Sequence, residues 1–437
     1  MIRRCLAVLF FGISATCLAT DYTHTGTANG VWSTTTDWTP TGFPNASGDI
    51  ARYNASTSIT TTQDVVAGIT VGTITRGGGG AATWTITPTN PITLNQDGAG
   101  SGTATLSNTG TSVGSSRLVL GVGTLTLADD LLVSNSGTST AASGAIQLSS
   151  TIGGTGNVTF TNVSNNPDVA AIVLSGTNTY TGSNTISAGA VIYSSNSPFG
   201  NSANALSVGS NGAASLVSTT STTTLSNNIV VGFASTIGGN STAGTNGATY
   251  AGTLTLNANV ALTSATTASG SVKFTNAISG FGGISKVGTG TVTLSGTGNS
   301  YQGGTSISAG TLIAAKDSAL GTGNVSLLAA SVTLTLQGGV TNNYIGDTVN
   351  LNIGFTNDVV NLNFAGTDTI GSLTVNGVQE PAGVYGASGV GVTVLPEFSG
   401  TGTLTVLGVI PEPSTWAMVG FGAVLLIAAQ RSRRIRA

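Results

Sequence analysis

The sequence predicts an all-β protein, built as a right-handed parallel β-helix or solenoid with end caps, plus an N-terminal signal peptide and one C-terminal transmembrane helix. Three observations predict the solenoid. Glycine supplies 64 of the 437 residues, whereas only 6% of them are charged. Short runs of alternating apolar and polar residues recur along the chain. Two long segments also repeat one another almost without gaps, which is typical of stacked architectures.

The composition excludes several classes of protein. An ordinary soluble domain has about 25% charged residues. The abundant Gly, Thr, Ser, Asn and Val are poor helix formers, and Thr and Val favour strands, so long helices are not expected in the middle of the chain. The glycines keep no three-residue period and there are only 10 prolines, which excludes collagen. Recurring Val, Ile and Leu disfavour a disordered linker.

Charge and cysteine are unevenly distributed. Between Asp21 and Ile410 there are six basic and fourteen acidic residues, so this part of the chain has a formal net charge of −8. We expect no nucleic-acid binding, because no basic patch is present to neutralise phosphates. Both cysteines, Cys5 and Cys17, lie before Ala19. A chain without that segment has no disulfide and no cysteine ligand for a metal.

The repeated segments are 174–200 and 294–321. Tyr180 and Tyr301, like Gly189 and Gly310, are 121 residues apart, and the sequence Gly-Thr-Leu-Thr-Leu at 123–127 returns at 252–256. These matches indicate a unit of about 80 residues that occurs at least twice. We therefore divide the chain into seven parts. The first four are a signal peptide (1–19), an N-terminal cap with the first β rungs (20–122), a first repeat unit (123–208) and connecting β rungs (209–251). The last three are a second repeat unit (252–328), C-terminal β rungs with a cap (329–408) and a tail (409–437).

Alternating residues predict short strands over 291–295, 305–308 and 311–313. Their inward side chains would be Leu294, Ile307, Leu312 and Leu320, with Ser and Thr outward. The glycines between the strands, which supply positive φ at tight corners, are Gly296, Gly303, Gly304, Gly310 and Gly321. Turns of about 20–25 residues, each adding about 4.8 Å, would give a rod on the order of 80 Å long. A chain of β-sandwiches is the alternative, but the glycine density and scarcity of large aromatics favour the solenoid.

The two ends have the composition of targeting segments. Arg3 and Arg4 precede an apolar run from Cys5 to Ile13 and then small residues, so we expect a secretory signal peptide that signal peptidase removes after Ala19. At the other end, a predicted helix over 414–430 would span roughly 25 Å. Its cytoplasmic end would be held by the arginines that follow it, Arg431, Arg433, Arg434 and Arg436.

The C-terminal tail resembles the PEP-CTERM sorting signal. The residues that carry this resemblance are Pro411, Glu412 and Pro413, the single helix after them, and the terminal arginine cluster. The resemblance implies recognition and cleavage by an exosortase, a membrane cysteine protease or transpeptidase. It also implies transient anchoring in the inner membrane of a Gram-negative bacterium, followed by transfer to the cell surface or extracellular matrix. A plain, permanent membrane anchor is the alternative.

The repeated body resembles the autotransporter-associated β-strand repeat. The resemblance rests on Gly-Gly-Ile-Ser-Lys at 282–286, on Asn299 and Tyr301, and on the glycines and threonines that follow. The copy at 174–200 keeps the second half of this pattern, but Gly153-Gly154-Thr155-Gly156 has no lysine matching Lys286. The resemblance implies a passenger-type surface rod without catalytic residues. Such passengers end in a membrane barrel, whereas this chain ends in the sorting tail, so we expect export by the general secretion machinery.

Two flanking segments are typical of the ends of such proteins. Trp32, Trp38 and Tyr53 lie before the repeats, and Pro381, Tyr385 and Phe398 lie after them. A solenoid must cover its open end strands, so we interpret these aromatic residues as caps. Stacking of Trp32 and Trp38 on sugar rings is the functional alternative.

The polar residues do not predict a catalytic site. Carboxylates are scattered, and the adjacent Asp129 and Asp130 would point to opposite faces of a strand. His24, the only histidine, lies beside the signal cleavage site, where we expect a solvated position. We therefore expect no catalytic residue, no metal and no cofactor, and a non-enzymatic structural or adhesive role at the surface or in a biofilm matrix, with exopolysaccharide as a candidate partner. The alternatives are a carbohydrate-active β-helix enzyme and an ice-binding array of Thr-x-Thr pairs.

Overall fold

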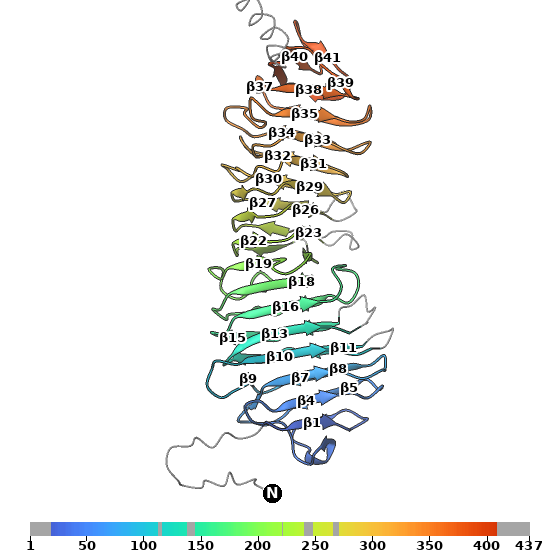
Figure 1. Ribbon diagram of the computed structural model, residues 1–437, viewed down its shortest axis with the longest axis vertical. Helices are drawn as coiled ribbons and strands as arrows, with labels where there is room; N and C mark the ends of the chain where they lie inside the picture. The colour runs from blue at the N-terminus through green and yellow to red at the C-terminus, as the bar shows by residue number, and fades with distance from the viewer. Residues whose placement is uncertain are drawn as a thin grey trace, which may run out of the picture.

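The protein is a rod in which successive coils of a β-solenoid are stacked, with its N-terminal part at one end and a C-terminal cap at the other (Figure 1). One full coil of the solenoid is called a turn below. The computed structural model describes residues 19–111, 116–137, 145–220, 222–239, 248–264 and 271–408. Across these residues the chain forms a parallel β-solenoid of about 13 turns. The predicted solenoid is therefore confirmed, while its right-handed sense stays a prediction.

Each complete turn places up to three short strands one after another, and equivalent strands of successive turns pair in parallel. The strands in the first position are β1 (Asp21–His24), β4 (Ile50–Tyr53), β7 (Thr73–Arg76), β10 (Thr103–Asn108), β13 (Asp130–Asn135), β16 (Val158–Asn162), the first half of β18 (Asn184–Tyr193), β19 (Leu206–Val208), β22 (Ile229–Val231), β25 (Leu254–Leu256) and β28 (Ile278–Gly280). Those in the second position are β2 (Gly30–Val31), β5 (Ile59–Gln63), β8 (Thr83–Pro88), β11 (Arg117–Leu120), β14 (Ile146–Leu148), β17 (Ile172–Leu174), the second half of β18, β20 (Ala214–Ser218), β23 (Ser235–Gly239), β26 (Val260–Thr263), β29 (Ile284–Val287), β31 (Thr305–Ile307), β33 (Val325–Leu327), β35 (Asn350–Ile353) and β38 (Ser372–Val375).

The third position is occupied by two separate ladders. The first consists of β6 (Ile69–Val71), β9 (Ile92–Leu94), β12 (Thr124–Leu127) and β15 (Thr151–Gly154). The second consists of β21 (Thr223–Leu225), β24 (Ala248–Tyr250), β27 (Ser271–Phe274), β30 (Thr291–Leu294), β32 (Thr311–Ala314), β34 (Thr333–Gln337), β36 (Val359–Asn363) and β42 (Phe398–Gly400).

Antiparallel pairing among the described strands is confined to the two ends. At the N-terminal end β1 pairs with β3 (Trp38–Thr39), which follows a 3-10 turn at Thr35–Asp37. At the C-terminal end β38 pairs with β39 (Val378–Gln379), and β40 (Gly383–Gly386) pairs with β43 (Thr403–Val406). The remaining cap strands are β37 (Thr367–Ile370) and β41 (Thr393–Val394). Because the pairing between these ends is parallel, the alternative of a chain of antiparallel sandwiches is wrong.

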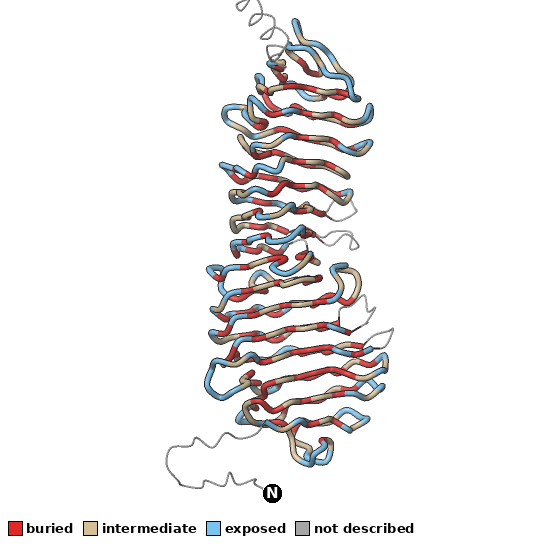
Figure 2. Tube along the Cα trace, in the orientation of Figure 1, coloured by how far each residue is buried: buried red, intermediate tan, exposed pale blue. Residues whose placement is uncertain are grey.

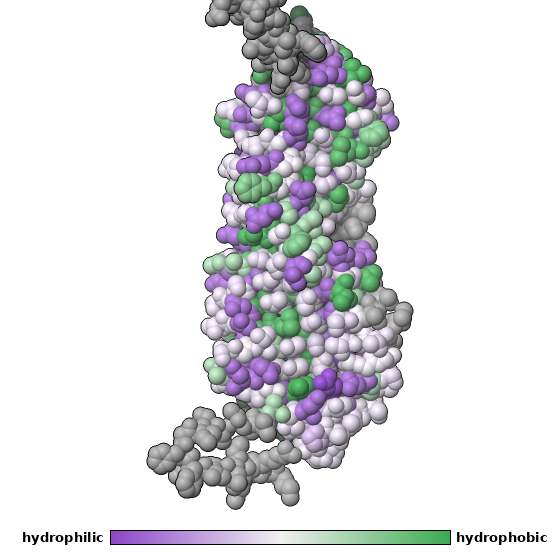
Figure 3. Space-filling view, viewed as in Figure 1, coloured by the Kyte–Doolittle hydropathy of each residue, from purple (hydrophilic) through white to green (hydrophobic). Residues whose placement is uncertain are grey.

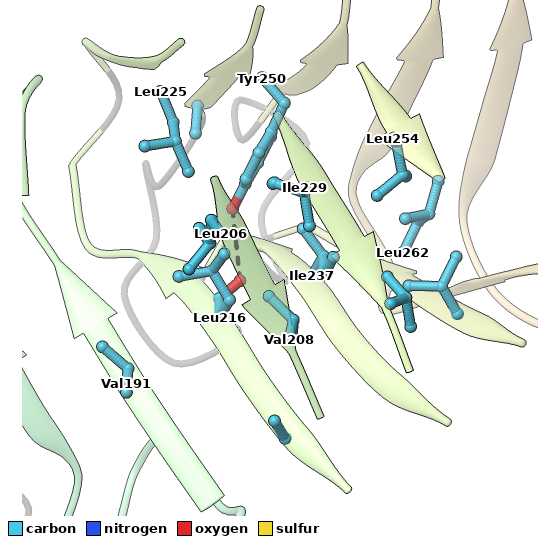
Figure 4. Close-up of a cluster of buried hydrophobic side chains, with 14 of the residues drawn as sticks. Val191, Leu206, Val208, Leu216, Leu225, Ile229, Ile237, Tyr250, Leu254 and Leu262 are labelled. Carbon is cyan, nitrogen blue, oxygen red and sulfur yellow. Dashed lines mark hydrogen bonds between the residues drawn. The ribbon is translucent and has the colours of Figure 1, made fainter. Parts of the chain in front are cut away.

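The core results from alternation of buried and less buried residues along most strands, visible as recurring buried positions in Figure 2, whereas β20 is buried along its whole length. The predicted inward residues Leu294, Ile307, Leu312 and Leu320 are all buried. Their equivalents in successive turns stack into one apolar column that continues from Tyr22 to Val406. Figure 4 shows part of this column, where the hydroxyl of Tyr250 donates a hydrogen bond to the carbonyl of Leu216 over 3.3 Å.

Turn length varies because the corners differ while the strands stay in register. A short turn of the second repeat runs from Thr305 to its partner Val325. A much longer turn near the N-terminus runs from Thr83 to its partner Arg117. The predicted turn length therefore holds for the second repeat but is too short near the N-terminus, where longer corners are inserted.

One corner of the lower rod is filled by stacked asparagines. The side-chain amide of Asn108 donates to Oδ1 of Asn135 over 3.0 Å, and that of Asn135 donates to Oδ1 of Asn162 over 2.8 Å. All three are buried. Buried amides need partners, and the parallel register supplies one from the next turn.

Both predicted targeting segments extend outside the described residues. The signal peptide (1–19) reaches them only at its last residue, Ala19, and the tail with Pro411, Glu412, Pro413 and its arginines is not reached at all. Within the described part of the chain, no helix has the length and apolarity needed to cross a membrane.

Candidate functional site

The Asn-x-Tyr motif of each repeat joins three successive turns. In the second copy, Asn299 accepts a hydrogen bond from the backbone N–H of Ile278 over 2.8 Å and donates to the carbonyl of Ala319 over 2.8 Å. In the first copy, Asn178 accepts from the N–H of Ile152 and donates to the carbonyl of Pro198. One buried amide therefore satisfies a backbone group of the turn before it and one of the turn after it.

The tyrosine of the motif is buried in both copies and hydrogen-bonds four residues ahead. The Tyr180 hydroxyl donates to Oδ1 of Asn184, and the Tyr301 hydroxyl shares a 2.5 Å hydrogen bond with the Thr305 hydroxyl. Thr305 is buried, so the expectation that every Ser and Thr of these strands points outward is wrong at this position. The interior Asn or Thr is present because the buried phenol needs a polar partner.

Close approach between turns, and not only positive φ, explains the repeat glycines. Gly321 has a φ of +69°, as predicted. At Gly303, by contrast, a Cβ would lie 2.3 Å from the backbone N of Gly283 in the preceding turn. Neither Gly303 nor Gly296 has a positive φ, so the prediction is wrong at both positions. A Cβ at Gly296 would lie 2.1 Å from the carbonyl oxygen of Asn276, so at both positions only a residue without a side chain lets the turns stack.

The two copies occupy different positions of the turn. Asn178 and Tyr180 stack on β15, in the third position, whereas Asn299 and Tyr301 stack on β28, in the first position. From the first half of β18 the ladder passes β19, β22, β25 and β28 before it reaches Tyr301. The second copy therefore lies five full turns plus one strand position after the first copy. The same motif thus joins turns on two different faces of the rod.

Lys286 lies inside the rod. Its Nζ donates hydrogen bonds of 2.7 to 2.9 Å to the carbonyls of Val287, Gly288 and Ala309. Burial lowers the pKa of this ammonium group to about 8. Its structural counterpart in the first copy is Phe160, the third residue of β16, as Lys286 is the third residue of β29.

The first copy therefore has no lysine at the place of Lys286, as predicted, but the residue at that place is Phe160, which lies after 153–156. Gly156 corresponds to Gly282, since a Cβ at either would lie 2.1 Å from a backbone carbonyl oxygen of the preceding turn. Val158, Thr159 and Phe160 then correspond to the Ile-Ser-Lys of the second copy. The corner after β16 is longer than the corner after β29, which hides this equivalence in the sequence.

The comparison with known families identifies these segments. The model of the passenger-associated transport repeat matches residues 172–192 and 284–314. Two segments of the chain are therefore similar to this repeat, and we call them the first and second passenger repeats. The match confirms the predicted autotransporter-associated β-strand repeats and fits a passenger-type protein exported to the surface of a Gram-negative bacterium. Neither a curated protein nor a solved structure matches the chain.

The passenger repeats span the structural parts described above. The first match covers β17 and nearly all of β18, and the second covers β29, β30, β31 and β32 with Lys286, Asn299 and Tyr301. Their shared residues satisfy backbone groups between turns or permit close stacking. None of these shared contacts brings together an acid and a base.

The N-terminal cap contains a buried aromatic cluster. The centroid of the His24 ring lies 4.8 Å from that of Trp38 and 5.8 Å from that of Tyr53. The rings of Trp32 and Trp84 are stacked, with their centroids 6.4 Å apart. The expectation of a solvated His24 is wrong, because alternation in β1 points this side chain into the rod. Trp32 and Trp38 are 0% and 1% exposed, so neither ring presents a face to a sugar.

Neither nitrogen of His24 makes a hydrogen bond of regular geometry among the described residues, and the backbone of Gly26 is a polar group that lies near the ring. Burial lowers the pKa of His24, and the nearby Asp37 opposes this effect. The imidazole is therefore neutral near pH 7 and packs as an aromatic ring.

The described carboxylates do not assemble into a site. Asp129 is buried and accepts from the N–H groups of Gln96 and Asp97, whereas Asp130 is exposed and binds Asn157. They thus lie on opposite faces, as predicted. Throughout the described ranges, no group of three or more His, Cys, Asp or Glu residues is placed to hold a metal ion.

The predicted Thr-x-Thr pairs are spread around the rod. Thr85 and Thr87 lie on β8 in the second position, Thr124 and Thr126 on β12 in the third, and Thr403 and Thr405 on the cap strand β43. Threonines that stack in direct register form only short rows, and these rows lie on different ladders. One ladder has Thr70, Thr93 and Thr126, and another has Thr291, Thr311 and Thr333. The pairs therefore do not form the single flat array on which the ice-binding alternative depends.

The rod is hollowed on the outer side of the second passenger repeat and of the turns next to it. A cavity of about 520 Å³ extends over four consecutive turns, and a smaller one of about 260 Å³ shares Asn259 and Ser285 with it. We call the two together the repeat groove. Figure 3 shows one face of the rod, on which strongly hydrophilic and hydrophobic residues are scattered over a mostly pale surface.

Proposed function

We propose that the chain is a non-enzymatic, exported rod of the cell surface or extracellular matrix, with a structural or adhesive role. The observation that carries this proposal is the pair of passenger repeats built into a continuous solenoid. Their shared side chains hold turns together, as expected of a unit selected to build length. The scattered carboxylates and the buried, neutral His24 support a role without catalysis.

Delivery is the second part of the proposal. The general secretion machinery would export the chain, signal peptidase would cleave after Ala19, and the C-terminal helix would hold the chain in the inner membrane. An exosortase would then cleave near Pro411–Pro413 and transfer the body to the surface or matrix. The sequence supports this order, because two prolines are expected to keep the segment extended just before the apolar run, where a membrane protease would reach it.

Mass spectrometry of the surface fraction tests delivery in a Gram-negative host that encodes an exosortase. We expect mature chains that begin after Ala19 and lack Trp416 and everything after it. Substitution of Pro411, Glu412 and Pro413 by alanine should retain the tail, whereas Pro381→Ala, an exposed proline of the cap, should not. Surface chains that keep Trp416 in the presence of the active exosortase would reduce the tail to an anchor.

A further inference from the structure

We infer that the repeat groove binds an uncharged glycan chain laid along the axis of the rod. The inference rests on the proposed surface function and adds the class of ligand and its place. It starts from the composition of the groove, which is lined mostly by hydroxyl, amide and glycine residues of the second passenger repeat and of the turns next to it. The apolar residues in the lining are Ala234, Val260, Ala261, Ile284 and Leu328. No charged side chain among the described residues lines it.

Glycines form the hollow. Gly283, Gly303, Gly304 and Gly323 lie at the corner that leads into β29, β31 and β33, and all four line the larger cavity. Because these positions have no side chain, the corner recedes between Asn259 on one side and Asn324 on the other. Gly283 and Gly304 stack in register with both asparagines, so the hollow follows one line along the axis, with one of the two amide walls at each end of it.

The walls carry free hydrogen-bonding groups. Asn259 and Asn324 use their Oδ1 atoms to accept from the N–H groups of Gly283 and Asn350, which leaves both Nδ2 groups unpaired within the described chain. The exposed side-chain amide of Gln302 has no partner there either. Sugars offer many hydroxyls, each able to donate and accept, and amides and hydroxyls match them without charge.

The floor repeats at the spacing of the turns. Ser285, Ser306 and Ser326 stack in direct register, and Ala261 and Thr236 continue the same row into the smaller cavity. Five turns at about 4.8 Å give a groove of roughly 19 Å. One turn is close to the length of one ring in an extended 1,4-linked glycan, so successive rings over Ser285, Ser306 and Ser326 would meet equivalent hydroxyls.

Exposed aromatic residues adjoin the groove. Phe281 is 75% exposed and lies between Gly280 and Gly282, whose carbonyls accept from Gln302 and Gly303. Phe233 is 50% exposed and directly precedes Ala234 in the smaller cavity. An exposed phenyl ring beside polar groups can cover the apolar face of a sugar ring, which compensates for its unfavourable exposure to water.

Calorimetric titration of the full chain, purified in detergent, tests the inference. The probes are neutral hexasaccharides of glucose, mannose, galactose and xylose, with hexagalacturonate as the acidic comparison. We expect at least one neutral probe to bind, and Phe281→Ala combined with Gln302→Ala to weaken that binding about tenfold or more. The matched control combines Phe355→Ala and Gln379→Ala, which are exposed residues outside the groove and should leave binding unchanged.

Three results would overturn the inference: no neutral probe binds, only hexagalacturonate binds, or the groove variant binds as well as the control variant. Circular dichroism of both variants shows whether the fold is kept. Their amounts in the surface fraction are measured in the same strains. If the rod reaches the surface but binds no neutral glycan, glycan binding by the groove is refuted and the proposed function still holds. If the chain binds a neutral glycan but is not exported, glycan binding is supported and the proposed function is refuted.

Discussion

Phe160, which lies just before the first passenger repeat, occupies the interior position that Lys286 occupies in the second. The phenyl ring packs edge-on against Phe199, with centroids 5.9 Å apart, while the ammonium group binds three carbonyls. The third residue of the equivalent strands β16 and β29 is thus an apolar ring in one case and a hydrogen-bonded ammonium group in the other. The difference gives the two repeats different responses to mutation and to pH.

Truncation of either residue should destabilise the rod for different reasons. Phe160→Ala leaves a cavity and should cost about 3–5 kcal/mol. Lys286→Ala leaves three carbonyls without this donor and should cost about 2–4 kcal/mol. Urea unfolding followed by circular dichroism measures both. Val122→Ala, at an exposed corner residue, is the control and should stay within about 0.5 kcal/mol of the native chain.

Alkaline pH should stabilise the second repeat. The pKa of Lys286 is about 8 in the folded chain, below the ordinary value of 10.5, so the unfolded chain binds more protons between these values. The free energy of unfolding should therefore rise between about pH 8 and pH 10.5, by an amount of the order of 2–3 kcal/mol. The measurement is the difference in urea midpoint between the native chain and Lys286→Met at pH 7.5 and pH 10. A difference that does not change with pH would contradict the prediction.

Acid should loosen the N-terminal cap. The pKa of His24 is lowered by burial, so below about pH 6.5 the unfolded chain takes up a proton before the folded chain does. Stability from the neutral ring is then lost as the pH falls. Trp32, Trp38 and Trp84 lie around or near this ring and report its loosening by fluorescence. His24→Phe keeps the aromatic packing, and its fluorescence should stay constant over the range in which the native signal changes.

The C-terminal cap should respond in the opposite direction. Burial raises the pKa of Asp368 to about 7, although its carboxylate accepts from the N–H groups of Tyr344 and Ile345. Between about pH 4 and pH 7 the folded chain binds more protons, so the cap loses stability as the pH rises. Hydrogen exchange of residues 341–370, corrected for the intrinsic effect of pH, should show increased opening over this range. Asp368→Asn should remove the dependence, and a persistent slope in that variant would assign it to another group.

The Asn-x-Tyr motif gives a test of how turns are joined. Asn299→Ala removes the partner of the Ile278 N–H and of the Ala319 carbonyl and should cost about 2–4 kcal/mol. Asn299→Asp keeps the acceptor for Ile278 but loses the donor to Ala319. We expect its urea midpoint, measured above pH 6, to stay below that of the native chain, because the carboxylate cannot donate to this carbonyl. An alanine variant as stable as the native chain would show that the motif does not join the turns.

The sequence by itself determined the repeating strands, their inward residues and the equivalence of the two passenger repeats. Alternation of period two fixes which side of a strand is buried, so Leu294, Ile307 and Leu312 could be assigned to the core without coordinates. Recurring glycines and the Asn-x-Tyr pattern identified the unit for the same local reason, since each acts on its neighbouring turns. The caps could likewise be predicted from the aromatic residues at the ends.

Only the tertiary structure decided which residues from distant parts of the chain meet. Corners of unequal length shift the second repeat by one position around the rod and hide the match between Phe160 and Lys286. The burial of His24 follows from the pairing of β1 with β3 and β4 at the open end, which no local pattern specifies. The repeat groove likewise exists because Asn259, Gly283, Gly304 and Asn324 come into register across four turns. Register is a property of the stack, since it depends on the length of every corner between these residues.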